Sequence, residues 1–84
     1  MPKKVTIYTT NYCPYCMRAK GLLKRKNVVY QEIDVTHDEK KRNELEEKTG
    51  WSTVPQIFIG EKFIGGADDL DALDAKGKLD ELLK

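Results

Sequence analysis

The sequence predicts an α/β fold, a four-stranded mixed sheet flanked by helices in the order β-α-β-α-β-β-α. In the first part of the chain, β-rich runs alternate with segments whose apolar residues recur at helical spacing. A strand, helix and strand in this order form a parallel pair with a right-handed crossover. Two short apolar runs then flank Gly60-Glu61, which indicates an antiparallel hairpin.

The first strand and the first helix lie on either side of the chain's two cysteines. Lys4–Thr9 is rich in β-branched residues and is followed by polar residues, so we expect a strand there. We expect a helix over Pro14–Lys26, because one side of that segment is apolar. The residues on this side are Cys16, Ala19, Leu22 and Leu23.

The second strand and helix are predicted by similar signals. Val28–Asp34 is β-rich and predicts a strand. A helix is expected over Glu39–Thr49, with Thr36 or Asp38 as its N-cap and Gly50 directly after its last residue. This segment has few apolar residues, so the helix should lie largely on the surface.

The last part of the chain predicts the hairpin and a final helical region. The two strands of the hairpin are expected over Gln56–Ile59 and Glu61–Gly66. The helical region should run from Asp68 to the C-terminus with a break near Gly77. Its apolar side consists of Leu70, Leu73, Leu79, Leu82 and Leu83.

Length, charge and hydropathy limit the classes of function. The chain has 84 residues, which fits one domain spanning residues 1–84. Its net charge of +1 gives no reason to expect nucleic acid or an anionic membrane as a partner. It has no apolar run long enough for a membrane span and no recognisable signal peptide, so we expect a cytoplasmic protein. No feature favours an oligomer, and we expect a monomer.

Cys13 and Cys16 lie at the expected start of the first helix. Proline is favoured at the first helical position, so Pro14 places Cys13 at the N-cap. A thiolate there meets the free amides of Tyr15 and Cys16 and the positive end of the helix dipole. Cys16 lies one turn further along the apolar side and should be more buried. We therefore expect Cys13 to attack a disulfide and Cys16 to resolve the mixed disulfide.

Three other interpretations of the cysteine pair remain open. A structural disulfide is one, although so short a loop removes little entropy from the unfolded chain. A zinc site is another, but zinc needs four ligands and His37 is the only other soft donor. Two buried thiols without a function are the third, since free cysteine is often part of a core. A CxxC pair between a strand and a helix instead indicates a thioredoxin-like redox site.

Two further segments add to the candidate site. Pro55 precedes an apolar strand and could have a cis peptide bond, which would leave backbone groups of Val54 free for an extended peptide. An ordinary turn proline is the alternative. Asp68 and Asp69 follow two glycines and could bind an ammonium group of a ligand, with free amides of the helix start taking its carboxylate. Simple helix capping is the alternative for these acids.

The motifs CPYC, TVPQIFIG and GGADDL, in this order and spacing, resemble the glutaredoxin family over nearly the whole chain. The resemblance is to the small dithiol members. It implies a thioredoxin fold with a cis Pro55, and glutathione-dependent reduction of protein disulfides and of protein–glutathione mixed disulfides. It makes Cys13 the nucleophile and Cys16 the resolving thiol. Glutathione would be the electron donor, and no metal is expected.

The resemblance also implies a groove for glutathione. Its expected residues are Tyr15, Arg42, Thr53, Val54, Pro55, Asp68 and Asp69. Backbone groups of Thr53 and Val54 would hold the cysteinyl part, and Asp68 with Asp69 would bind the γ-glutamyl end. Many members have a lysine three residues before the first cysteine, where this chain has Thr10. Arg42 is therefore the expected cation for the glycine carboxylate.

Two other functions stay open. One is a redoxin of the same fold that is reduced by thioredoxin reductase, which the acids at Asp68 and Asp69 disfavour and Thr10 weakly favours. The other is a carrier of an iron–sulfur cluster, which fits CPYC poorly because the second thiol can form a disulfide instead. The expected partners are glutathione and disulfide-containing or glutathionylated proteins.

Overall fold

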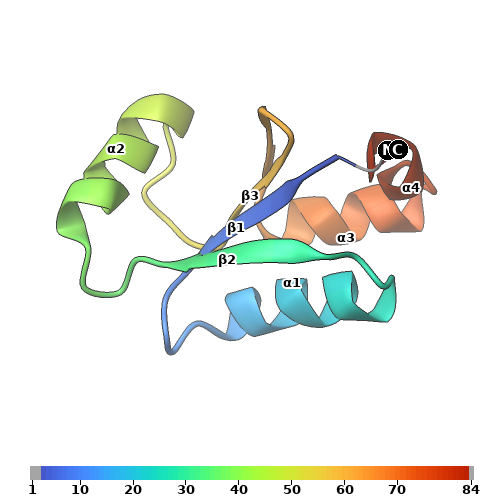
Figure 1. The fold of residues 1–84 in the computed structure, drawn as a ribbon, viewed down its shortest axis with the longest axis horizontal. Coiled ribbons are helices and arrows are strands. Elements are labelled where there is room, and N and C mark those ends of the chain that lie inside the picture. The colour runs from blue at the N-terminus through green and yellow to red at the C-terminus, as the bar shows by residue number, and fades with distance from the viewer. Residues whose placement is uncertain (1–2, 84) are drawn as a thin grey trace.

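The computed structural model describes residues 3–83, which form one sheet and the helices around it (Figure 1). The elements are β1 (Val5–Thr9), α1 (Pro14–Arg25), β2 (Tyr30–Asp34), α2 (Glu39–Thr49), β3 (Gln56–Ile59), β4 (Lys62–Gly65), α3 (Ala67–Ala75) and α4 (Leu79–Leu83). The strand order is β2-β1-β3-β4. β1 is parallel to β2 and antiparallel to β3, and β3 is antiparallel to β4, so the predicted mixed sheet is confirmed.

The start of the second strand was predicted two residues too early. Asn27 has a positive φ of 58°, and the amide of Val28 donates to the carbonyl of Leu23 at 2.9 Å. Residues 26 and 27 therefore form a turn after α1, residues 28 and 29 are irregular, and the strand begins at Tyr30. The other predicted boundaries agree within one residue, and the break in the last helical region occurs at Gly77, between α3 and α4.

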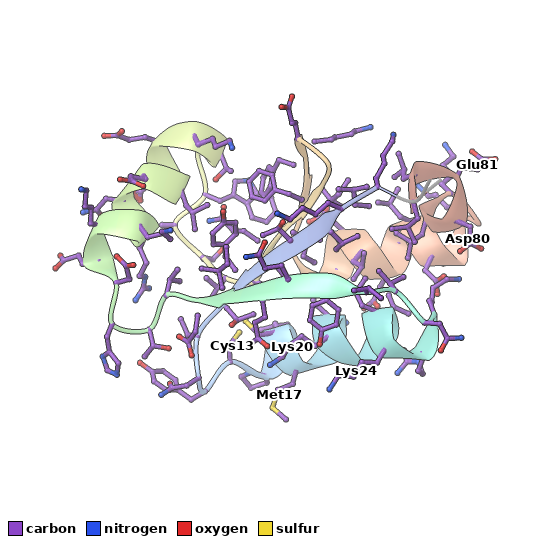
Figure 2. All side chains as sticks on the ribbon, viewed as in Figure 1. Cys13, Met17, Lys20, Lys24, Asp80 and Glu81 are labelled. Carbon is purple, nitrogen blue, oxygen red and sulfur yellow. The ribbon has the colours of Figure 1, made fainter. Side chains whose placement is uncertain are left out.

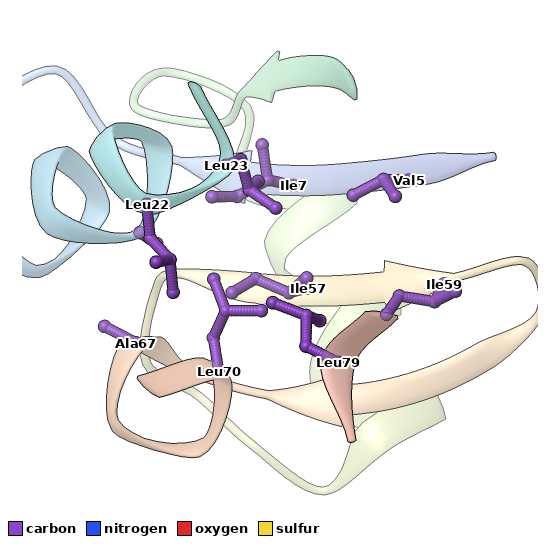
Figure 3. Close-up of a cluster of buried hydrophobic side chains, with 10 residues drawn as sticks. Val5, Ile7, Leu22, Leu23, Ile57, Ile59, Ala67, Leu70 and Leu79 are labelled. Atoms are coloured by element: carbon purple, nitrogen blue, oxygen red, sulfur yellow. The ribbon is translucent and has the colours of Figure 1, made fainter. Parts of the chain in front are cut away.

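The main core lies between one face of the sheet and the helices α1, α3 and α4 (Figure 3). The apolar residues at alternate positions of β1 and β3 point toward these helices, as the strand period requires. The members of this core are Val5, Ile7, Ala19, Leu22, Leu23, Ile57, Ile59, Ala67, Leu70 and Leu79. Because α1 and α3 share this core, the starts of both helices have fixed positions relative to the sheet.

The opposite face of the sheet is lined by aromatic residues and by α2. Tyr8 and Phe58 are in edge contact, with ring centroids 5.7 Å apart. The ammonium of Lys48 on α2 lies 5.0 Å from the Phe58 ring centroid. Leu45 is the buried apolar residue of α2, which agrees with the expected surface position of this helix.

The sheet topology brings two distant loops to one end of the molecule. Tyr8, near the end of β1, pairs with Gln56 at the start of the antiparallel β3. The loop that follows β1 and carries Cys13 therefore lies beside the loop that precedes β3. At the other end, the amide of Lys3 donates to the carbonyl of Leu83 at 3.0 Å, so the two ends of the described chain are adjacent.

Removal of core volume should destabilise this fold strongly. Leu70 is fully buried, so Leu70→Ala should lower the free energy of unfolding by about 2–5 kcal/mol. Val29 is 92% exposed, so Val29→Ala should change the free energy of unfolding by no more than about 0.5 kcal/mol. Urea unfolding of the reduced protein measures both values. Similar losses in the two variants would contradict the central position of Leu70.

Candidate active site

The predicted position of Cys13 at the N-cap of α1 is confirmed. Pro14 is the first residue of the helix, and Cys13 has an extended backbone with φ −105° and ψ 109°. The Cys13 Sγ accepts a hydrogen bond from the backbone amide of Cys16 at 3.2 Å. The helix start therefore directs an amide donor at this sulfur, as the spacing of the two cysteines predicts.

The two thiols have different environments. Both are reduced; Cys13 is half-buried, whereas Cys16 is 1% exposed. Burial raises the pKa of the Cys16 thiol to about 12, and a hydrogen bond with Cys13 also contributes. Cys16 thus keeps its proton at neutral pH, and Cys13 is the more accessible of the two thiols. This is the predicted asymmetry.

The loop before β3 lies against Cys13. The peptide bond between Val54 and Pro55 is cis, as predicted. The Cys13 thiol donates to the Val54 carbonyl, with the sulfur 3.7 Å from the oxygen. Residues 41 positions apart in the sequence therefore form one site. The backbone of Val54 therefore lies directly beside the Cys13 sulfur.

Gln56 holds this loop in place, and the sequence analysis did not identify it. Its side chain is buried, with 2% exposure, and its Nε2 donates to the carbonyls of Trp51 and Thr53 at 2.9 and 3.0 Å. Its Oε1 accepts from the Thr49 hydroxyl at 3.0 Å. A polar residue that opens an otherwise apolar strand was the available signal, because a buried amide needs partners.

A groove of about 330 Å³ runs from the start of α1 to the start of α3. It is lined by Tyr15, Trp51, Thr53, Val54, Pro55, Gly66, Ala67, Asp68 and Asp69. Six of the seven groove residues expected from the sequence are therefore brought together. Trp51 forms a wall of the groove and packs edge-on against Phe63, with ring centroids 5.2 Å apart.

Arg42 is the expected groove residue that this groove does not include. It lines a separate hollow of about 510 Å³ near the start of α2. The hollow is formed by Thr36, His37, Glu39, Arg42, Asn43, Glu46 and Ser52. Of these residues, Ser52 is the one directly next in sequence to a residue of the groove.

The two neighbouring acids at the start of α3 have different roles. The Asp69 carboxylate accepts from the amide of Gly66 at 3.0 Å, so it caps the helix. A side chain at Gly65, which has a φ of 120°, would overlap this carboxylate. Asp68 has a side chain that is 84% exposed, and it pairs with Arg18 at 3.3 Å. Asp68 is therefore the acid that is accessible to a ligand.

The described residues carry no sign of a metal site or of a membrane helix. Within residues 3–83, no group of three or more His, Cys, Asp or Glu side chains is placed to hold a metal ion. His37 lies in the hollow with Arg42. No helix in the same residues is long and apolar enough to cross a membrane.

Comparison with known proteins gives close relatives over nearly the whole chain. A glutaredoxin family model matches residues 5–64. The chain is 58% identical over 79 residues to a glutaredoxin of Pseudomonas aeruginosa, with 94% of each chain covered. It is 55% identical over 80 residues to glutaredoxin 3 of Escherichia coli K12, covering 95% of this chain and 96% of the relative.

Solved structures agree with this similarity. Glutaredoxin from Brucella melitensis superposes with a TM-score of 0.89 at 52% identity, covering 99% of this chain and 90% of the other. A complex of buckwheat glutaredoxin with glutathione superposes with a TM-score of 0.90 at 34% identity. The match covers 94% of this chain and 74% of the buckwheat chain. These likenesses confirm the thioredoxin fold expected from the motifs.

The difference between the two thiols should be measurable by alkylation. At pH 8, iodoacetamide should modify Cys13 and leave Cys16 unmodified, because burial both shields Cys16 and raises its pKa to about 12. Peptide mass mapping of the reduced protein gives the site and the rate. In denaturant both thiols should react. Labelling of Cys16 at a rate similar to that of Cys13 in the folded protein would contradict the assigned environments.

Proposed function

The chain belongs to the glutaredoxin family, and from this premise we propose that Cys13 is the nucleophile and Cys16 the resolving thiol. As a family member, the protein is a glutathione-dependent thiol–disulfide oxidoreductase. The observation that carries the residue assignment is the position of the Cys13 sulfur. It lies at the start of α1, accepts from the Cys16 amide and borders the Val54 backbone at the end of the groove.

One route uses Cys13 alone. Its thiolate attacks the glutathione sulfur of a protein–glutathione mixed disulfide, and the protein thiolate leaves with the electron pair of the broken bond. Glutathione then remains bound to Cys13 through a disulfide. The thiolate of a second glutathione attacks the bound glutathione sulfur, which releases oxidised glutathione and restores the Cys13 thiolate.

The second route uses both thiols and reduces protein disulfides. Cys13 attacks one sulfur of the substrate disulfide and forms a mixed disulfide with the protein. Cys16 then attacks the Cys13 sulfur, which releases the reduced substrate and forms the Cys13–Cys16 disulfide. Two glutathione molecules reduce this disulfide in turn. The accessible Cys13 and the buried Cys16 suit these two roles.

The groove is the proposed binding site for glutathione. Backbone groups of Thr53 and Val54 would pair with the cysteinyl part, beside Cys13. The exposed carboxylate of Asp68 would bind the γ-glutamyl ammonium, while Asp69 keeps the start of α3 in place. Arg42 remains the proposed cation for the glycine carboxylate, because its hollow includes Ser52, which precedes Thr53. The glutathione bound to the buckwheat relative supports a site of this kind.

The remaining assignments are also proposals. We propose that residues 1–84 form a single domain, that the protein is a monomer, and that it acts in the cytoplasm. Its protein partners would be disulfide-containing or glutathionylated proteins. The relatives named glutaredoxin support the single domain, because the chain covers 94% and 96% of their length.

The electron donor can be tested directly with a glutathionylated peptide. NADPH oxidation should be fast with glutathione and glutathione reductase, and near background with thioredoxin reductase alone. Turnover with thioredoxin reductase alone would contradict the proposed donor. It would mean that this chain, which has Thr10 in place of the lysine of many family members, is reduced by thioredoxin reductase instead of glutathione.

The two cysteines should separate the two activities. Cys16→Ser should retain most of the reduction of glutathionylated peptide, because that route needs Cys13 alone. It should lose most of the reduction of a protein disulfide, with insulin as the substrate. Cys13→Ser is the matched variant and should lose both activities. Equal losses of both activities in Cys16→Ser would disprove this division of roles.

Asp68 should be required for affinity to glutathione rather than for the rate of chemistry. Asp68→Asn should raise KM for glutathione about tenfold, because it removes a charge-assisted contact to the γ-glutamyl ammonium. Asp71→Asn is the control, since it removes the same charge from the same helix and also a partner of Arg18. Steady-state kinetics should give a nearly unchanged KM for the control. An equal rise in both variants would assign the effect to Arg18.

A further inference from the structure

The dithiol route places an unusual demand on Cys16. To attack the Cys13 mixed disulfide, Cys16 must become a thiolate, since the thiol is a poor nucleophile. Its sulfur is buried, and burial raises its pKa to about 12. A neighbouring positive charge would favour the thiolate and make this step faster at neutral pH.

Lys20 is placed to supply that charge. It lies four residues after Cys16 on α1, and side chains at this spacing are neighbours on one face of a helix. Its ammonium donates to the Glu32 carboxylate of β2 at 3.0 Å, so it lies between α1 and the sheet (Figure 2). The Lys20 side chain is 26% exposed, which limits the weakening of its field by water.

Glu32 and Thr9 hold this ammonium in position. The fully buried Thr9 hydroxyl donates to the same Glu32 oxygen at 2.8 Å. Glu32 raises the pKa of Lys20, and Lys20 lowers the pKa of Glu32, mainly through their hydrogen bond. Both groups are therefore charged at neutral pH. Residues of α1, β1 and β2 thus hold the Lys20 ammonium together.

The groups that act on Cys16, or on the Lys20–Glu32 pair beside it, come from the start of α1, the loop after β1, and β2. At the start of α1, the N-cap residue Cys13 disfavours a Cys16 thiolate, chiefly through their hydrogen bond, whereas Lys20 on α1 favours it and is the smallest of these influences. The backbone of Thr10, after β1, also favours the thiolate. On β2, Tyr30 and Glu32 act on Lys20, and Asp34 acts on Glu32. Once Cys13 has formed a mixed disulfide it carries no charge, and the effect of Lys20 is no longer opposed by it.

We propose that Lys20 is a positioning residue for the resolving step: its ammonium, anchored by Glu32 and Thr9, stabilises the thiolate of Cys16 as it attacks the Cys13 mixed disulfide. This inference rests on the proposed dithiol route. In the step, a bond forms between the Cys16 and Cys13 sulfurs, and the bond between Cys13 and the substrate sulfur breaks. The substrate thiolate leaves with the electron pair and takes up a proton equivalent to the one that Cys16 released. The substrate is reduced and the cysteine pair is oxidised.

The test measures the resolving step alone. Reduced protein is mixed with excess Ellman's reagent, and each thionitrobenzoate released is followed by its absorbance in stopped flow. The first release reports attack by Cys13, and the second reports closure by Cys16. Lys20→Gln should slow the second release about threefold at pH 7 and shift its pH profile upward by about half a unit, because Lys20 is the smallest influence on the Cys16 pKa and a half-unit rise lowers the thiolate fraction about threefold. Lys20→Arg should keep most of the wild-type rate.

Lys24→Gln is the matched control, because Lys24 is exposed and lies one further turn along α1. It removes the same charge and should leave both releases unchanged. An unshifted second release in Lys20→Gln, or an equal change in Lys24→Gln, would overturn the proposal. A merely structural role of Lys20 would lower the unfolding midpoint without moving the pH profile.

A second comparison separates this inference from the proposed function. In a Cys16→Ser background, Lys20→Gln should have no further effect on the reduction of glutathionylated peptide, since no Cys16 thiolate forms. A further loss there would mean that Lys20 acts on Cys13 or on the groove, and the inference would fail while the proposed function stands. If Cys16→Ser itself kept full protein-disulfide reduction, the dithiol route would fail first.

Discussion

The antiparallel pairing of β1 with β3 is the constraint on which the site depends. It places the end of β1 beside the start of β3, with Tyr8 opposite Gln56. The helix start that carries Cys13 and the loop that carries Val54 thereby meet, although they are far apart in the chain. The parallel pairing of β1 with β2 adds the Glu32 carboxylate beneath the same helix. Without this strand order, Cys13 and Val54 would not meet at one end of the molecule.

The backbone around the site is held by buried hydrogen bonds, whereas several of its side chains are exposed to solvent. Gln56 supplies both amide hydrogens to carbonyls of the loop, so the loop backbone is held from inside the protein. Asp69 does the same for the start of α3 through the Gly66 amide. The parts of the groove that face outward, above all Tyr15 and Asp68, are exposed. The contacts that maintain the shape of the groove are thus separate from the groups that can contact a ligand. Substitutions of the ligand-facing groups should therefore leave the fold intact.

Local signals explain why so much of this protein could be predicted from its sequence. Pro14 after Cys13 predicted the first helix start, and Gly50 predicted the end of α2, because caps and glycine act on adjacent residues. For the start of α2 the sequence left Thr36 and Asp38 open, and Asp38 is the N-cap. The three motifs located the groove through family resemblance. What could not be predicted depends on side chains that meet across the fold. The turn at Asn27, the hydrogen bonds of Gln56, the pairing of Arg18 with Asp68 and the separate hollow of Arg42 are of this kind.

The hydrogen bond between Lys3 and Leu83 has a practical consequence for the architecture of larger proteins. The ends of the described chain meet at the end of the molecule that carries α4, whereas Cys13 lies toward the opposite end (Figures 1 and 2). A partner domain fused at either end would extend away from the reactive sulfur. A short peptide that joined the two ends could close the chain into a ring, and new ends could then be opened at an exposed turn residue such as Asn27. The adjacent ends of the described chain therefore suit this fold to fusion with another protein or to insertion into one.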